Sequence, residues 1–491
     1  MIWTEALRFF YERERRVYAE GLLQLEHVQR QRLQSILKSL PASQSQGLST
    51  YEQFCREIPM LDENSWQSMI RKQRDNSQSL VCNTDRIKRY EPTSGSSGHR
   101  KWIPYTHEFL SELNRAAAAW MADVYRQYPK SFQGRFYWSL SWLPEELRKE
   151  SCSDDSKLFP FWQSLFLQKI FAVPAQVAGA PSSEEAWLLT LKALMAAPDL
   201  SLISVWSPTY LLKVWESLES MWQDCLRGME SSSRKKLPSS RPDHPSELWP
   251  RLALISCWDS ASSKVWAEKV RAVFSGVPIQ GKGLWATEGA VTIPFEKSQR
   301  LAIRSHFYEF VEINTGSIFP AWALQEGMMV QPLLTTSSGL LRYPLQDRLE
   351  VSKVDRMGPQ LNFLGRLAGV DLVGEKMDTP QVQELSGQLR SKGIEILFLV
   401  GVRTPRPHYV CVLQNKNYAA SVTDGLARQI DESLKKSHHY RVARELGQLE
   451  PAQVLFVRDA LHYQENFYRS AILGQNKPEA LYEIDRLPEI I

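Results

Sequence analysis

Residues 91–101 hold the side chains with the clearest chemical potential, a run of hydroxyl residues and two glycines that ends in a lysine. Glycines let backbone N–H groups approach an anion closely. Hydroxyls add further donors, and the lysine adds a positive charge. We therefore predict a phosphate-binding loop that holds a nucleotide. The expected phosphate-binding residues are Thr93, Ser94, Gly95, Ser96, Ser97, Gly98 and Lys101.

Two other interpretations of this segment remain open. Segments rich in Ser and Gly are most often surface loops or linkers. Residues 95–99 also nearly match the G-x-S-x-G elbow of hydrolases, although His99 stands where the final glycine belongs. The spacing differs from the Walker pattern, so other segments must decide.

Two polar segments follow runs that we expect to be strands. Thr287 and Glu288 come after a short apolar run. A hydroxyl beside a carboxylate there could hold phosphate together with Mg²⁺, which favours one or two carboxylates plus phosphate oxygens. Asp347 ends the second segment and could accept hydrogen bonds from both ribose hydroxyls. An ordinary turn or a capping residue is the alternative in each case.

Cationic residues appear in the last third of the chain. Arg366 opens a glycine-containing segment that reaches Lys376, and this pattern indicates a hinge that carries charge to the site. A solvated linker is the alternative. Lys477 stands in a Gly-Gln-Asn-Lys-Pro loop, from which it could reach an acyl phosphate. An ordinary surface lysine is the alternative there.

Together these segments resemble the Gretchen Hagen family of acyl acid-amido synthetases, the plant auxin- and jasmonate-conjugating type, along most of the chain. The matches are Thr-Ser-Gly-Ser-Ser-Gly at 93–98, Trp-Ser-Pro-Thr at 206–209, Ala-Thr-Glu-Gly at 286–289, Gly-Glu-Lys at 374–376 and Gly-Gln-Asn-Lys-Pro at 474–478. General acyl-CoA ligases share the first match but not Trp-Ser-Pro-Thr, so the set is specific.

The resemblance implies an AMP-forming ligase that uses ATP and Mg²⁺ to join a small carboxylic acid to an amino acid. It implies that Ser96, Ser97 and Thr287 bind phosphate, that Glu288 holds Mg²⁺ and that Asp347 binds the ribose. Arg366 is expected among the nucleotide-binding residues.

The same resemblance makes Lys376 and Lys477 the candidates that stabilise the transferring phosphoryl group, which is usually a large catalytic contribution. Trp206 and Tyr210 are candidates for the acyl pocket, with core packing as the alternative. Two other functions remain open: an acyl-CoA or carrier-protein ligase with a thiol acceptor, and a non-catalytic nucleotide-binding relative.

The elements that must position these residues indicate an α/β fold. Short apolar strands alternate with helices between residues 201 and 286, which favours a largely parallel sheet that binds ligands at the carboxyl ends of its strands. Residues 307–351 indicate an antiparallel β-subdomain. The resemblance implies the acyl-adenylate-forming fold, with an adenylation domain over residues 1–376 and a mobile α+β domain over residues 377–491 that rotates near Lys376.

Composition narrows the class of protein. The 491 residues carry 59 Lys and Arg against 55 Asp and Glu, a net charge of +4 that is too small to favour a nucleic-acid partner. Six scattered cysteines without a C-x-x-C pair indicate free thiols and a cytoplasmic location. The first residues predict no secretory signal, and no apolar stretch predicts a membrane span. The oligomeric state, the acid and the amine are left open.

Overall fold

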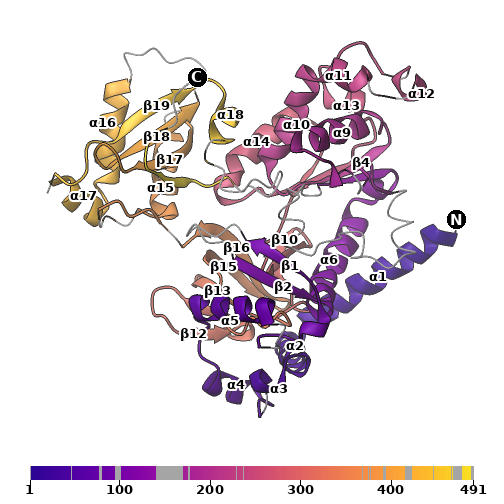
Figure 1. The fold of residues 1–491 in the computed structure, drawn as a ribbon, viewed down its shortest axis with the longest axis vertical. Coiled ribbons are helices and arrows are strands. Elements are labelled where there is room, and N and C mark those ends of the chain that lie inside the picture. Colours follow the sequence, from indigo (N-terminus) through magenta and orange to yellow (C-terminus); the bar gives the residue numbers. More distant parts are fainter. Residues whose placement is uncertain are drawn as a thin grey trace.

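The structure of the protein is a computed structural model (Figure 1). It describes residues 2–45, 47–76, 80–93, 101–139, 170–174, 177, 179–227, 229, 231–235, 237–367, 369–373, 375, 377–390, 394–414, 423–445, 447–465, 467 and 478–487. Three parts can be followed in Figure 1: N-terminal helices on an antiparallel sheet, a parallel sheet with its helices, and a C-terminal unit. Among the described residues, no helix combines the length and hydropathy that crossing a bilayer requires.

The N-terminal part begins with five helices: α1 (Ile2–Leu22), α2 (Leu25–Ser39), α3 (Ala42–Ser45), α4 (Tyr51–Glu57) and α5 (Glu63–Asn76). Two helices therefore replace the single one that the pattern over residues 5–38 predicts. Helices α1 and α2 both contact residues 301–303. Tyr18 Oη of α1 donates to Leu301 O at 2.7 Å, and Gln29 Nε2 of α2 donates to Ile303 O at 2.8 Å. The interruption expected at Pro59 is confirmed between α4 and α5.

A hairpin and a long helix follow: β1 (Ile87–Thr93), β2 (Lys101–Thr106) and α6 (His107–Gln127). The two strands are antiparallel, and Thr93 pairs with Lys101 at the open end of the ladder. The Thr106 side chain accepts a hydrogen bond from Phe109 N at 3.1 Å and caps α6. Neither strand of the hairpin is predicted from the sequence.

The parallel sheet consists of β3 (Arg135–Trp138), β4 (Leu200–Ser204), β5 (Leu254–Cys257) and β6 (Ile279–Gly281), in that spatial order. All three pairs are parallel. The intervening helices are α9 (Ser183–Met195), α10 (Pro208–Ser220), α11 (Trp222–Arg227), α12 (Ser231–Arg234), α13 (Pro245–Leu248) and α14 (Lys264–Val273). This alternation confirms the predicted α/β class. The strand expected over residues 283–286 is found in part, as the short strand Trp285–Ala286, but it pairs outside this sheet, whose last strand β6 ends at Gly281.

The antiparallel part has a small hairpin and an eight-stranded sheet. The hairpin is β7 (Trp285–Ala286) with β8 (Gly289–Ala290). The sheet strands are β9 (Thr292–Phe295), β10 (Ser298–Leu301), β11 (Phe307–Glu312), β12 (Ile318–Pro320), β13 (Met329–Thr335), β14 (Tyr343–Pro344), β15 (Asp347–Asp355) and β16 (Gly358–Arg366). Their order is β12-β11-β13-β15-β16-β10-β9, and β14 pairs with β13. The antiparallel pattern predicted for residues 307–351 is confirmed.

The C-terminal unit is the predicted α+β arrangement. Its elements are α15 (Thr379–Arg390), β17 (Ile396–Val402), β18 (His408–Gln414), α16 (Thr423–Leu434), α17 (His438–Glu445), β19 (Gln453–Val457), α18 (Ala460–Glu465) and β20 (Leu481–Ile484). The sheet order is β19-β18-β17-β20. Leu426, Ile430 and Leu434 are buried, as their spacing predicts. The domain boundary at residues 376 and 377 stays a prediction.

The C-terminal unit contacts the parallel-sheet part through apolar and charged side chains. Leu212 of α10 and Phe398 of β17 belong to one buried apolar cluster. Lys213 Nζ donates to Glu465 Oε1 at 2.5 Å across the same contact. The C-terminal unit therefore packs against α10, the helix that follows β4.

Candidate active site

The β1–β2 hairpin holds the two ends of the predicted phosphate loop. Residues 94–100 connect the paired ends Thr93 and Lys101, so Ser94, Gly95, Ser96, Ser97 and Gly98 lie outside the described residues. The Lys101 ammonium forms an ion pair with Glu63 of α5. The loop is thus attached to a two-stranded base, and Lys101, which opens β2, is held by Glu63.

Thr287 and Glu288 form the turn of the β7–β8 hairpin. Tyr105 Oη, from β2, donates to the Thr287 carbonyl at 3.0 Å. Tyr343 Oη, from β14, donates to Glu288 Oε1 at 3.3 Å. The turn therefore lies between the hairpin that carries the phosphate loop and the antiparallel sheet, as a shared site requires.

Gly289 closes this turn in a conformation that suits only glycine. Its φ is +155°, and a Cβ there would lie 2.7 Å from both His306 Nε2 and Leu334 Cδ2. The next residue, Ala290, donates its backbone N–H to His306 Nε2 at 3.2 Å. The imidazole thus packs directly under the turn and fixes the backbone beside Glu288.

His306 belongs to a buried network that the sequence analysis missed. Because Nε2 accepts a hydrogen bond, the ring proton sits on Nδ1, which donates to Glu112 Oε2 at 2.8 Å. Glu112 Oε1 also accepts from Ser337 Oγ at 2.6 Å and from Arg32 Nη2 at 3.2 Å. Burial chiefly lowers the pKa of His306, which keeps the ring neutral and able to accept. This network supports the turn from behind.

Asp347 and Arg366 are directly paired residues on β15 and β16. Asp347 is buried. Arg366 Nη1 lies 3.7 Å from Glu479 Oε1. Glu479 therefore lies beside Arg366, and it follows Lys477 by two residues in the sequence. Lys477 and Lys376 themselves lie outside the described residues.

The four charged groups act on one another electrostatically. The pKa of the Glu288 carboxyl is raised, first by burial and then by the Asp347 carboxylate, while Lys101 and Arg366 oppose the shift. Burial alone would lower the pKa of Arg366, but Glu479, Asp347 and Glu288 together raise it. The structure therefore brings Lys101, Glu288, Asp347 and Arg366 together. Two carboxylates and two cations can hold a metal ion and an anionic phosphate side by side.

Arg342, the residue before β14, has an unusual backbone conformation. Arg342 has φ of +54°, a region that side-chain-bearing residues rarely adopt. Its guanidinium Nε donates to Glu309 Oε2 at 2.8 Å, and Nη1 donates to Ile58 O at 2.8 Å. These contacts anchor Arg342 so that the next residue, Tyr343, reaches Glu288.

The two predicted acyl-pocket residues lie in different surroundings. Trp206 is partly exposed just beyond β4, and its ring centroid lies 6.2 Å from that of Trp285 in β7. Tyr210 is buried in α10, where its hydroxyl lies 2.7 Å from that of Tyr137. Trp206 thus stands near the Thr287 turn, whereas Tyr210 packs in the core of the parallel-sheet part. Their roles in binding an acid stay predictions.

Among the described residues, Glu288 and Asp347 are the carboxylates that we consider as ligands for a metal ion. Among them, no three His, Cys, Asp or Glu side chains cluster as metal ligands. A site for Mg²⁺ there would use one or two carboxylates together with phosphate oxygens. Glu288 with Asp347 nearby is a donor set of that kind.

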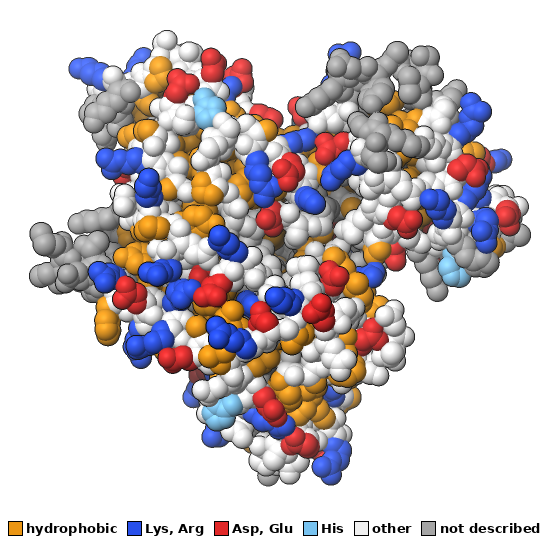
Figure 2. Space-filling model, turned by 180° about the vertical axis from the view of Figure 1, so that it is seen from behind, with side chains coloured by type: hydrophobic (Ala, Val, Ile, Leu, Met, Phe, Trp, Pro, Cys, Tyr) orange, Lys and Arg blue, Asp and Glu red, His pale blue; other side chains and the backbone are white. Residues whose placement is uncertain are grey.

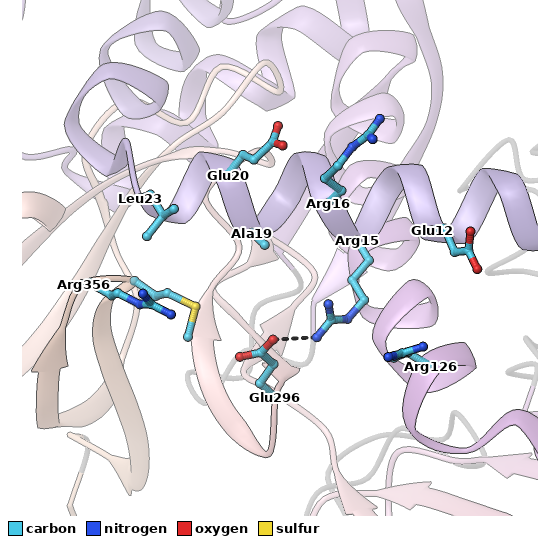
Figure 3. Close-up of a pocket in the computed structure, with 10 residues that line it drawn as sticks. Glu12, Arg15, Arg16, Ala19, Glu20, Leu23, Arg126, Glu296 and Arg356 are labelled. Atoms are coloured by element: carbon cyan, nitrogen blue, oxygen red, sulfur yellow. Dashed lines mark hydrogen bonds and ion pairs between the residues drawn. The ribbon is translucent and has the colours of Figure 1, made fainter.

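A separate hollow of about 470 Å³ lies between α1, α6 and two β-turns (Figure 3). Arg15 Nη2 forms an ion pair with Glu296 Oε1 at 2.5 Å in this hollow. None of the predicted site residues lines it; the lining residues are Glu12, Arg15, Arg16, Ala19, Glu20, Leu23, Arg126, Glu296, Arg356 and Met357. Charges of both signs are also interspersed over the face in Figure 2 rather than gathered in one basic patch.

Comparisons with known proteins agree with this geometry. Residues 22–240, 300–366 and 380–483 match the models of the GH3 family N-terminal, central and C-terminal domains. Two solved structures are similar at 15% identity, one titled GH3.15 acyl acid amido synthetase, the other AtGH3.15 acyl acid amido synthetase in complex with 2,4-DB. They have TM-scores of 0.73 and 0.74, cover 94% of this chain, and are themselves covered to 92% and 93%. A search of curated proteins found no match. The likeness confirms the predicted fold, with a large N-terminal part and a small C-terminal unit.

Proposed function

Since this chain belongs to the GH3 family, we propose that it is an ATP-dependent, AMP-forming ligase that joins a carboxylic acid to an amine through an acyl-adenylate. The expected amine is an amino acid. The observation that carries the proposal is the convergence of Lys101, Glu288, Asp347 and Arg366 beside the ends of a Thr-Ser-Gly-Ser-Ser-Gly loop. The titles of the two similar structures, which name acyl acid amido synthetases, support the same reaction.

In the first step, a carboxylate oxygen of the acid attacks the α-phosphorus of ATP. The bond between that phosphorus and the bridging oxygen of the β-phosphate breaks, and pyrophosphate leaves. We assign Lys101 and Arg366 to the phosphate oxygens and Asp347 to the ribose hydroxyls. Backbone N–H groups of the loop and the hydroxyls of Ser96, Ser97 and Thr287 complete the proposed phosphate site.

Glu288 is the residue that we propose to hold Mg²⁺ with the phosphates. Bound there, Mg²⁺ would neutralise charge on the phosphate oxygens and so favour departure of pyrophosphate. The raised pKa of Glu288 fits this role, because a carboxylate disfavoured by burial and by Asp347 is stabilised by a nearby cation. Tyr343 and the Gly289 turn orient the carboxylate.

In the second step, the amine nitrogen attacks the carbonyl carbon of the acyl-adenylate. The carbon–oxygen bond to AMP breaks, the nitrogen loses a proton, and the amide and AMP are released. We propose that Lys477 and Lys376 reach the α-phosphoryl group from the C-terminal side. The position of Glu479 beside Arg366 supports this for Lys477, since only Pro478 separates it from Glu479.

Acid-dependent exchange of labelled pyrophosphate into ATP tests the first step. Purified protein would be assayed with Mg²⁺ and a panel of aryl, indolyl and aliphatic acids, without an amine. Exchange with some acids is the expected result. Measurable ATP binding without exchange for any acid would contradict the proposal and favour a non-catalytic relative.

The acceptor needs a separate product assay. Acids that support exchange would be incubated with ATP and either an amino-acid mixture or coenzyme A, and the products weighed by mass spectrometry. Amides without thioesters are expected. Thioesters without amides would overturn the amine assignment while leaving adenylation intact.

We also propose that the protein works in the cytoplasm. Five of its cysteines lie among the described residues, and all five are free thiols: Cys55, Cys82, Cys225, Cys257 and Cys411. A reducing compartment keeps such thiols unpaired. Fractionation of cells that produce the protein tests this; recovery in a secreted or membrane fraction would contradict it.

A further inference from the structure

Lys282 is a buried cation that the proposed reaction leaves without a role. It follows β6 directly and is only 6% exposed. Its Nζ donates to Ser204 Oγ at 2.8 Å. Among the described residues, no carboxylate forms an ion pair with it, and Cys257 is the titratable group that acts on its pKa. An ammonium has three donors, so the hydroxyl of Ser204 leaves capacity for a further acceptor.

Aromatic rings surround this amine. Lys282 Nζ lies 4.6 Å from the ring centroid of Trp120, 5.1 Å from that of Trp138 and 4.5 Å from that of Trp206. Burial lowers the pKa of Lys282 to about 7. The ring faces act in the opposite direction, because they attract a cation. Lys282 is therefore an amine poised between its neutral and charged forms inside an aromatic wall, and an anion beside it would favour the ammonium.

Two further tryptophans extend the wall. The ring centroid of Trp206 lies 5.8 Å from that of Trp258 and 6.2 Å from that of Trp285. We call Trp120, Trp138, Trp206, Trp258 and Trp285 the tryptophan cluster. All but Trp120 keep part of their surface exposed, whereas tryptophans that only fill a core are enclosed. Partly exposed, flat rings suit a planar ligand.

The cluster stands at the edge of the parallel sheet where ligands bind. Trp138 ends β3, Ser204 ends β4, Trp258 directly follows β5, and Lys282 directly follows β6. The carboxyl ends of parallel strands share one edge, and this is the edge that binds ligands in open α/β sheets. Trp285 then leads through Ala286 to the Thr287–Glu288 turn.

Lys282 and the Thr287–Glu288 turn are distinct polar groups on one short stretch of chain. Four residues lie between Lys282 and Thr287 along the chain. Lys282 donates to Ser204, whereas Glu288 accepts from Tyr343, so the two side chains have different neighbours. In the proposed reaction the attacking carboxylate lies beside the phosphates at the turn, which leaves the other end of the acid for the rings near Trp285 and for Lys282.

We propose that the tryptophan cluster holds the acyl part of the acid and that Lys282 selects acids with a second anionic group, a carboxylate or phenolate, at the end remote from the reacting carboxylate. This inference rests on the proposed adenylation activity. It makes Lys282 a specificity-determining residue for a planar, doubly acidic substrate. The Ser204 hydroxyl directs its amine.

Matched acids with one and two carboxylates test this selection. Benzoate would be compared with terephthalate, and cinnamate with 4-carboxycinnamate, by kcat/KM in pyrophosphate exchange. The wild-type protein should favour the diacid of each pair. Lys282→Met, which keeps the length and apolar stem of the side chain, should lower kcat/KM for the diacids by about 10- to 100-fold, the value of one charge-assisted hydrogen bond. The monoacids should change by less than about threefold, well below that value.

Lys130→Met is the matched control, because Lys130 is an exposed lysine outside the cluster. It should keep the wild-type ratio of diacid to monoacid. An unchanged ratio in Lys282→Met, or a wild-type preference for the monoacids, would overturn the inference while leaving adenylation intact. If Lys282 only supported the structure, Lys282→Met would lower kcat/KM for the diacids and for the monoacids by the same factor.

Exchange that fails for every acid would contradict the proposed function, and calorimetry then tests the site by itself. Terephthalate would be titrated into the wild-type protein and into Lys282→Met without ATP. Binding by the wild type that is lost in the variant supports an anion site at Lys282. Equal binding, or no binding to either protein, overturns it.

Discussion

The burial of Lys282 predicts that the protein gains stability as the pH rises from 7 to 9, and that Lys282→Met removes this gain. Burial lowers the pKa of Lys282 to about 7 in the folded chain, whereas a lysine in the unfolded chain titrates near ~10.4. Between these values the unfolded chain binds more protons than the folded chain. The free energy of unfolding therefore rises with pH, by at most about 1.4 kcal/mol per unit.

The expected rise between pH 7 and 9 is about 2 kcal/mol, because Lys282 is only half protonated at its own pKa. Below pH 7 the folded protein bears the full cost of the buried ammonium. The nearby Cys257 stays a neutral thiol throughout, since burial raises its pKa to about 12. The ring faces of the tryptophan cluster favour the ammonium form and can only reduce the rise.

Urea unfolding, followed by tryptophan fluorescence at pH 7, 8 and 9, measures this effect. The urea concentrations at the midpoint of unfolding are compared for the wild type, Lys282→Met and the exposed control Lys130→Met. The midpoint of the control should rise with pH as that of the wild type does. The midpoint of Lys282→Met should not show this rise, so the wild type should gain stability relative to Lys282→Met between pH 7 and 9. Parallel curves for all three proteins would show that Lys282 is not buried as an amine and would refute the reasoning.

Three more predictions concern the active site. Gly289→Ala should lose about 1–3 kcal/mol of stability and most exchange activity, whereas Gly276→Ala, also at positive φ but in open space, should keep its activity; equal losses would contradict this account. Tyr343→Phe removes the hydroxyl that donates to Glu288 and should lower kcat/KM for exchange about tenfold; an unchanged value would refute its role. Lys477→Ala should lower kcat by about 10²–10³ with ATP binding nearly intact, and persistent turnover would show that the assignment is wrong.

The parts of the fold that follow from short-range patterns could be predicted. The runs over β4 and β5 are short, apolar and buried throughout, which is typical of parallel strands covered on both faces. Leu426, Ile430 and Leu434 recur at helical spacing and are buried as expected. In each case one local signal, period or length, decides the structure.

The β1–β2 hairpin could not be predicted, and proline is the reason. Pro92 and Pro104 interrupt its two strands, and a proline inside an apolar run normally argues against a strand. Here the ladder has only two strands, so each proline nitrogen can face away from the partner. The composition of residues 91–101 predicts a loop, but it does not predict the two strands that form its base.

The buried side chains that pack under the Thr287–Glu288 turn could not be predicted from the sequence either. The contact between His306 and Glu112 joins residues 194 positions apart, and no local pattern marks either side chain. The same holds for Lys282, whose three tryptophan neighbours come from α6, β3 and the end of β4. Glu288 and Asp347, in contrast, can be singled out from the sequence because each ends a recognisable segment, and the structure brings the two carboxylates near each other, while their roles stay predictions.

The measurement that tests the central claim most directly follows oxygen from the acid into AMP. An acid that supports exchange would be labelled with ¹⁸O in both carboxylate oxygens and turned over with ATP and the amine. If the carboxylate attacks the α-phosphorus, each AMP should carry one ¹⁸O atom on its phosphate, as read by mass spectrometry. AMP without the label, or labelled inorganic phosphate released with ADP, would contradict an acyl-adenylate intermediate and with it the assignment of this site.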